Sequence, residues 1–221
     1  MIDMIKIIIY AGLSLSFDEA KSILDSDENI EVIYKRPIQR GDLGSAVKQH
    51  PDIIAIIDGV FHQNSAVGHK EILNAIRQDI KVCGASSMGA LRASELDSLG
   101  MMGVGYVYTQ YATGEVDGDD YVAVMLDSES LKPLSEPLIN MKYVFSNAVD
   151  ENIITECESR ELLSIAKRTY YPQRSYAKTL NESTLDDDKK TELIDFIRTS
   201  TDIKKEDAKE LLTLIKNHIS N

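Results

Sequence analysis

Residues 53–59 read Ile53-Ile54-Ala55-Ile56-Ile57-Asp58-Gly59 and form the most apolar segment of the chain. A run that is apolar on both faces is typical of a central strand in a parallel sheet, because helices cover such a strand on both sides. The run ends in a carboxylate and a glycine, which indicate a loop. This stretch therefore predicts the middle of an α/β sheet, with a polar residue directly after its central strand.

Short apolar segments and amphipathic segments alternate around this central strand. Further strands are expected at residues 5–10, 30–34, 80–84 and 104–108, and helices at residues 17–24, 43–49, 67–79 and 88–96. This alternation indicates an α/β fold with an open, mostly parallel, Rossmann-like sheet flanked by helices. From about residue 139 only helical patterns remain, so we predict an α/β core over residues 1–130 and a C-terminal all-helical segment over residues 139–221.

The composition argues against several classes of function. The chain has 221 residues and a formal net charge of −12, and nucleic-acid binding relies on Lys and Arg to neutralise phosphates. The apolar runs are far shorter than the roughly 18 residues of a membrane-spanning helix, and the N-terminus lacks the pattern of a signal peptide. Two cysteines make no disulfide framework. We expect a cytoplasmic protein that binds neither nucleic acid nor membranes.

The helical segment combines apolar faces with an excess of acidic residues. Helices of this length are marginal alone, so their apolar faces must pack against the α/β core or against a second copy of the chain in a homo-oligomer. The acidic residues indicate either a solvated helical surface or a docking face for a basic partner.

Polar residues follow three of the expected strands. Ser14 comes after the first strand, Asp58 after the central strand, and Ser86 and Ser87 after the fourth. In open α/β sheets ligands bind outside the carboxyl ends of the strands, so these residues are expected at one crevice. His69 begins the next helix and is a candidate for the same edge.

The segment Ala85-Ser86-Ser87-Met88-Gly89 lies between a strand and a helix and is similar to a nucleophile elbow centred on Ser87. The helix N-terminus offers N–H groups that stabilise an oxyanion or bind an anion. An Asp58 that orients His69, and a His69 that activates Ser87, would form a catalytic triad. Alternatively, Ser86 or Ser87 caps the helix, His69 is a surface residue, and Asp58 caps its own turn.

Other chemistry is weakly supported. The chain contains neither a GxxxxGK[ST] phosphate loop nor a GxGxxG loop, and its Cys and His residues lack zinc spacing. We therefore expect no cofactor and no metal. Cys83 is the candidate for persulfide chemistry, but its place inside a strand favours a buried, unreactive thiol.

Three runs carry a family resemblance: residues 56–61, residues 67–73, and Gly84-Ala85-Ser86-Ser87-Met88-Gly89-Ala90-Leu91-Arg92-Ala93-Ser94-Glu95-Leu96. They resemble the core of TfuA-like proteins, and the likeness extends over roughly residues 5–125. The resemblance implies a role in peptide backbone thioamidation, beside a YcaO-type enzyme that uses ATP to activate a backbone amide. It also implies that the protein helps sulfide reach that enzyme, by hydrolysing the C-terminal thiocarboxylate of a small ubiquitin-like sulfur-carrier protein.

Thiocarboxylate hydrolysis is acyl transfer to water, which needs a nucleophile or base and donors for the tetrahedral oxyanion. The expected catalytic residues are Ser87, His69 and Asp58, and the expected substrate-binding or oxyanion residues are Ser86, Ser14, Arg40, Arg92 and Glu71. Arg92 alternatively pairs with Glu95 or Glu71. Two other functions stay open: a non-catalytic activator that docks on the YcaO-type enzyme, and a generic serine hydrolase.

Overall fold

The computed structural model describes residues 4–24, 29–60, 65–127 and 133–219. Its contacts divide the chain into two units, of which the first comprises residues 1–117 with 204–221, and the second comprises residues 118–203. The last helix therefore belongs by its contacts to the first unit, although it follows the second unit in the chain.

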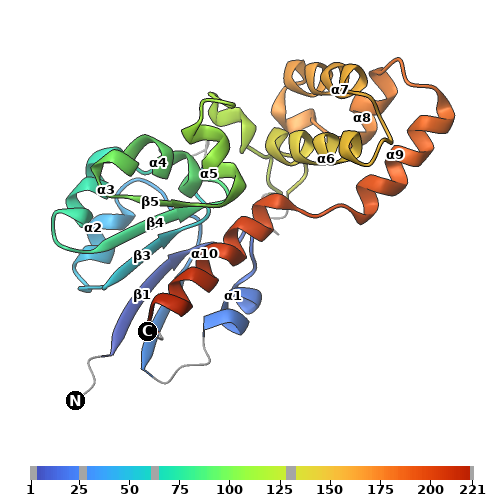
Figure 1. Cartoon of the computed structure of the whole chain (residues 1–221). Helices are drawn as coiled ribbons and strands as arrows, with labels where there is room; N and C mark the ends of the chain where they lie inside the picture. Colours follow the sequence, from blue (N-terminus) through green and yellow to red (C-terminus); the bar gives the residue numbers. More distant parts are fainter. Residues whose placement is uncertain (1–3, 25–28, 61–64, 128–132, 220–221) are drawn as a thin grey trace. The chain divides into compact units, whose positions relative to one another are not determined.

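The first unit contains a five-stranded parallel sheet within the described residues, which confirms the predicted fold class (Figure 1). In chain order the strands are β1 (Ile5–Tyr10), β2 (Ile30–Lys35), β3 (Ile53–Ile56), β4 (Lys81–Ala85) and β5 (Met102–Val104). Their order across the sheet is β2-β1-β3-β4-β5, with β3 in the middle. The strand order reverses between β1 and β3, and the carboxyl edge at such a switch point is where doubly wound sheets bind ligands.

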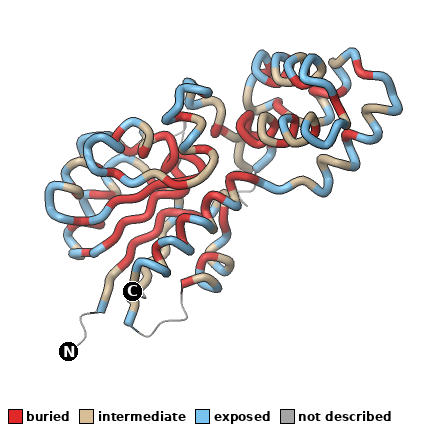
Figure 2. Tube along the Cα trace, in the orientation of Figure 1, coloured by how far each residue is buried: buried red, intermediate tan, exposed pale blue. Residues whose placement is uncertain are grey.

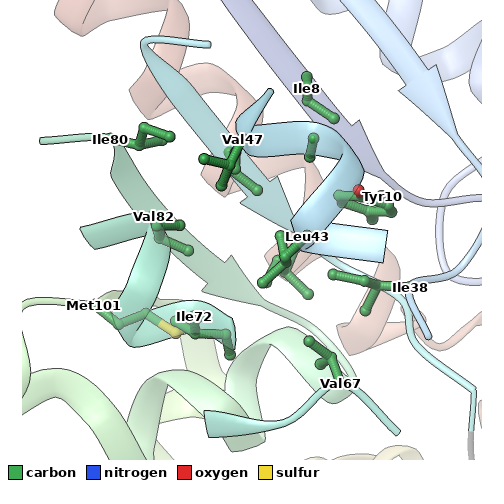
Figure 3. Close-up of a cluster of buried hydrophobic side chains, with 14 of the residues drawn as sticks. Ile8, Tyr10, Ile38, Leu43, Val47, Val67, Ile72, Ile80, Val82 and Met101 are labelled. Carbon is green, nitrogen blue, oxygen red and sulfur yellow. The ribbon is translucent and has the colours of Figure 1, made fainter. Parts of the chain in front are cut away.

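Helices cover both faces of this sheet. One face packs against α2 (Asp42–Val47), α3 (His69–Ile76) and α4 (Met88–Leu96), and the other against α1 (Phe17–Leu24) and α10 (Ile203–Ile219). The alternation of side chains along each strand explains the two cores, because Ile8 and Tyr10 lie on the first face while Ile7 and Ile9 lie on the second. Figure 3 shows the first core, and Figure 2 shows that the buried residues of the sheet concentrate in the three middle strands, β1, β3 and β4.

The predicted strand at residues 104–108 is wrong beyond its first residue. Val104 ends β5, Gly105 turns the chain at a φ of 92°, and α5 (Gly105–Ala112) follows. Asp207 of α10 accepts the Tyr106 N–H at 2.8 Å and the Val107 N–H at 2.7 Å. Its carboxylate thus satisfies donors that the first turn of a helix leaves without intrahelical partners. A cap that comes from a distant part of the chain leaves no local sequence signal.

From Leu138 onward the second unit is helical, as predicted for the chain from about residue 139. Its helices are α6 (Leu138–Asp150), α7 (Glu156–Arg168), α8 (Tyr176–Glu182) and α9 (Asp187–Thr199). It also contains short 3-10 turns at Asp119–Tyr121 and Tyr171–Gln173. In the first unit, a 3-10 turn at Asp97–Leu99 follows α4. Arg174 is buried here, and its guanidinium donates to the carbonyl oxygens of Ala166 and Asp120, both at 3.0 Å. Among the described residues no helix is long and apolar enough to cross a membrane.

Candidate functional site

The polar residues singled out in the sequence gather at the carboxyl edge of the sheet, around the switch point. The residues that follow β3 contact the end of β1, because the N–H groups of Ile57 and Asp58 both donate to the Tyr10 carbonyl. The end of β3 also meets the start of α4, because the Gly89 N–H donates to the Ile57 carbonyl at 3.3 Å. The loops after β1, β3 and β4 therefore form one continuous edge.

Asp58 is fully buried and holds the loop after β1. Its Oδ2 accepts the Leu13 N–H at 2.8 Å and the Ser14 N–H at 2.9 Å, while its Oδ1 accepts the Ser14 hydroxyl at 2.6 Å. Three donors satisfy much of the capacity of this carboxylate. The geometry thus makes Asp58 an anchor that fixes Ser14 beside the end of β3.

Residues 84–89, which we call the serine turn, connect β4 to α4. The Ser87 N–H donates to the Ala85 carbonyl at 2.8 Å, which closes a three-residue turn around Ser86. Ser86 has a φ of 70°, in the left-handed region that residues with a side chain rarely adopt. It is 0% exposed, and its hydroxyl has no hydrogen-bond partner among the described residues.

Ser87 occupies the N-cap position of α4, but its side chain makes no capping hydrogen bond and is 4% exposed. The first N–H groups of a helix have no intrahelical acceptor. The Gly89 N–H already donates to the carbonyl of Ile57. Within the described chain, the N–H groups of Met88 and Ala90 are therefore the donors that this end of the helix offers. Such donors suit an oxyanion or a carboxylate.

Two glycines make the serine turn possible. A Cβ on Gly84 would overlap the carbonyl oxygen of Gly89, and a Cβ on Gly89 would overlap the carbonyl oxygen of Ile56. The N-terminus of α4 therefore lies directly against β3 and β4. The spacing of Gly84 and Gly89 is the sequence signal that could have placed Ser86 at the apex of the turn.

His69 belongs to a second polar cluster, on α3 and α4. Its Nε2 lies 2.7 Å from Oε2 of Glu95, and the same oxygen accepts from Nη1 of Arg92 at 2.6 Å. Arg92 also donates through Nε to the Val67 carbonyl at 3.1 Å. In the described part of the chain no hydrogen bond joins His69 to Asp58 or to Ser87. The catalytic roles assigned to these three residues stay predictions.

The remaining candidates stabilise loops near this cluster. Glu71 accepts the Gly41 N–H at 2.7 Å and the Gly68 N–H at 3.1 Å, so its carboxylate connects the start of α2 to the start of α3. Arg40 has an exposed side chain, and its backbone N–H donates to the Ser65 carbonyl. Arg92 pairs with Glu95, which is one of the alternatives that the sequence offered for it.

Cys83 lies on β4, fully buried, and its Sγ donates to the Ile54 carbonyl at 3.6 Å. Burial raises the pKa of this thiol to about 12, so it stays protonated near neutral pH. A protonated thiol is a poor nucleophile and a poor sulfur carrier. One cavity, of about 420 Å³, borders Cys83 together with Met102, Leu214 and His218, and none of the candidate site residues line it.

The described residues contain no group of three or more His, Cys, Asp or Glu placed to hold a metal ion. The chain matches the family model described as TfuA-like protein over residues 58–175. The chain belongs to the TfuA-like family. A search of curated proteins finds no match. The TfuA-like match begins at Asp58, includes the serine turn and the His69–Glu95 pair, and ends one residue beyond Arg174.

Proposed function

We propose that this TfuA-like protein supplies sulfide to a YcaO-type enzyme by hydrolysing the C-terminal thiocarboxylate of a small ubiquitin-like sulfur-carrier protein. The TfuA-like family is associated with YcaO enzymes, and membership is consistent with an accessory role in thioamidation. The hydrolysis forms a C–O bond to water and breaks the C–S bond. It converts the thiocarboxylate anion and water into a carboxylate, hydrosulfide and a proton.

The observation that supports hydrolysis is the serine turn at the carboxyl edge of the sheet. This turn carries two hydroxyls and the N-terminus of α4, and it lies at the same sheet edge as Asp58, which accepts the Ser14 hydroxyl. Acyl transfer needs a hydroxyl or water that attacks the carbonyl carbon and donors that stabilise the tetrahedral oxyanion. The serine turn offers both kinds of group within a few residues.

A second candidate function is a non-catalytic activator of the YcaO-type enzyme. The arrangement of His69 favours it, because this imidazole is hydrogen-bonded to Glu95 and not to a hydroxyl of the serine turn. The three donors on Asp58 favour it too, because they occupy a carboxylate that a triad would use to orient a histidine. In this alternative the carboxyl edge binds the partner and transfers no group.

Purified components separate the two functions. The TfuA-like protein is incubated with a thiocarboxylated carrier, and released sulfide is measured with and without the YcaO-type enzyme. Release without that enzyme, above the rate of the carrier alone, supports hydrolysis. Stimulation only when free sulfide and the YcaO-type enzyme are both present supports the activator. Turnover of small esters in place of the carrier would indicate a generic serine hydrolase.

A further inference from the structure

Within the described residues β2 is an edge strand of the sheet, and it does not have the features that usually protect such an edge. It is six residues long, whereas β5 at the opposite edge has three. It pairs with β1 without a bulge from Ile30 to Lys35, and its apolar residues are buried only in part. Short strands, bulges and prolines are the usual means by which proteins prevent pairing at an edge. A long and regular edge such as β2 therefore favours a further strand beside it.

The backbone of β2 determines which of its residues an added strand would bond. The carbonyls of Asn29 and Lys35 each accept an N–H group from the β1 side, both at 3.0 Å. Backbone groups of successive residues point to opposite sides of a strand, so the odd-numbered residues of β2 face β1 and the even-numbered residues face the outer edge. An added strand would bond to the even-numbered residues.

The side chains of β2 alternate between the two cores. Ile33 packs against the first core, and Val32 and Tyr34 pack against the second. Glu31 and Lys35 lie two positions before and after Ile33, so they share its face of the sheet. They carry opposite charges at equal distances from Ile33. A second β2 that runs antiparallel and is centred on Ile33 would therefore bring each acid opposite a base.

We propose that β2 pairs with β2 of a second copy of this chain in that register, to form a homodimer. Glu31 of each copy then lies opposite Lys35 of the other, and Val32 lies opposite Tyr34. Opposite charges, and β-branched residues beside aromatic ones, stabilise neighbouring strands when they face each other. A shift of two residues in either direction places Ile33 opposite Glu31 or Lys35, so the charges select the register centred on Ile33.

The pairing is self-complementary, which a two-fold interface between identical chains requires. In each copy Nζ of Lys6 on β1 lies 3.3 Å from the Glu31 carboxylate. Lys35 of the second copy would complete a row of alternating charges across three strands. Antiparallel pairing directs the carboxyl edges of the two sheets to opposite ends of the dimer. Each candidate site then stays accessible, and the proposal does not depend on the hydrolysis proposed above.

Charge reversal tests the proposal by sedimentation equilibrium of the full chain. Glu31→Lys and Lys35→Glu should each raise the dimer Kd by about tenfold or more, because each variant places two like-charged pairs in the interface. The double variant Glu31→Lys/Lys35→Glu restores both opposite pairs, and its Kd should return to within about threefold of the wild type. The Tm of each variant shows whether the fold is kept.

Glu210→Lys, at an exposed position of α10, is the matched control. It makes the net charge of −12 less negative by the same amount as Glu31→Lys. A smaller net charge weakens the general repulsion between copies, so the control should associate at least as tightly as the wild type. Weaker association of Glu31→Lys alone would therefore identify local pairing at β2.

A disulfide tests the register independently. Ile33→Cys is made in a Cys157→Ser background, which removes the exposed thiol. It should form a covalent dimer on mild oxidation, because directly opposed residues of such a pair have Cα atoms about 4.5 Å apart, within the range that a disulfide spans. Val32→Cys in the same background should not, since Tyr34 lies opposite it.

Three results would overturn the proposal. One is a wild-type protein that stays monomeric up to about 0.1 mM, which would leave β2 to a strand from another protein. The second is a folded double variant that associates no better than the single variants. The third is a covalent dimer through Val32→Cys and not through Ile33→Cys. None of these results bears on sulfide release, so the two proposals fail separately.

Discussion

Replacement of Asp58 tests whether this carboxylate holds the site together or takes part in the chemistry. Its side chain is fully buried and accepts three hydrogen bonds, two from the backbone N–H groups of Leu13 and Ser14 and one from the Ser14 hydroxyl. Hydrogen bonds to a charged group contribute about 1.5–3 kcal/mol each, and their losses add incompletely because the loop relaxes. We expect Asp58→Ala to lower the free energy of unfolding by about 3–5 kcal/mol, which is below the roughly 4.5–9 kcal/mol that three independent hydrogen bonds of this kind would contribute.

For a chain of this length about 1 kcal/mol corresponds to roughly 2–4 °C in Tm, so the expected loss is about 6–20 °C by calorimetry or thermal circular dichroism. Ser14→Ala is the matched control, because it removes one of the three donors and should cost about 1 kcal/mol. The double variant should lose less than the sum of the two single variants, since they share one bond. A loss of sulfide release in Asp58→Asn with a Tm within about 2 °C of the wild type would refute the anchoring role and indicate a chemical one.

Three further predictions concern other parts of the chain. Asp207→Ala removes the acceptor for the N–H groups of Tyr106 and Val107. It should lower the free energy of unfolding by about 3 kcal/mol and accelerate amide hydrogen exchange at those two residues. Unchanged exchange would show that α5 needs no cap from α10. Iodoacetamide should label the exposed Cys157 and spare Cys83 in the folded protein, because burial raises the pKa of the Cys83 thiol to about 12; equal labelling would contradict this. The pKa of Glu19 is lowered to about 2, mainly by its hydrogen bond to Lys205 and next by its hydrogen bond to Ser16. The ionised Glu19 therefore stabilises the fold above the ordinary carboxyl pKa of 4.5, and this stabilisation is lost as pH falls toward 2. The Tm difference between wild type and Glu19→Gln should accordingly shrink over that range, and a constant difference would argue against the ion pair between α1 and α10.

Most of the sheet could be predicted from the sequence because its strands carry strong local patterns. The run around Ile54 is apolar on both faces, and only a covered parallel strand accommodates such a run easily. Local patterns do not predict the structure of residues 105–108. Tyr106 and Val107 are residue types that favour a strand, but they begin a helix whose N–H groups Asp207 accepts. Tertiary capping overrides local preference there.

The sequence predicts where in the sheet the candidate site lies, but not which side chains form hydrogen bonds with one another. Ser14, Asp58 and Ser86 follow strands, and the carboxyl edge of a parallel sheet brings such residues together. The partner of each side chain depends on where neighbouring loops and helices lie. The hydrogen bond between His69 and Glu95 joins two helices, and the sequence spacing of these residues does not reveal it. The left-handed backbone of Ser86 is likewise a property of the folded turn, which only the positions of Gly84 and Gly89 indicate.

The most direct test of the account is the intact mass of a thiocarboxylated carrier after incubation with the purified protein alone. The account predicts that the carrier is converted to its carboxylate and that sulfide appears in equal amount. A carrier that keeps its thiocarboxylate in the presence of folded wild-type protein, and loses it only when the YcaO-type enzyme is added, would contradict the claim that this chain performs the hydrolysis.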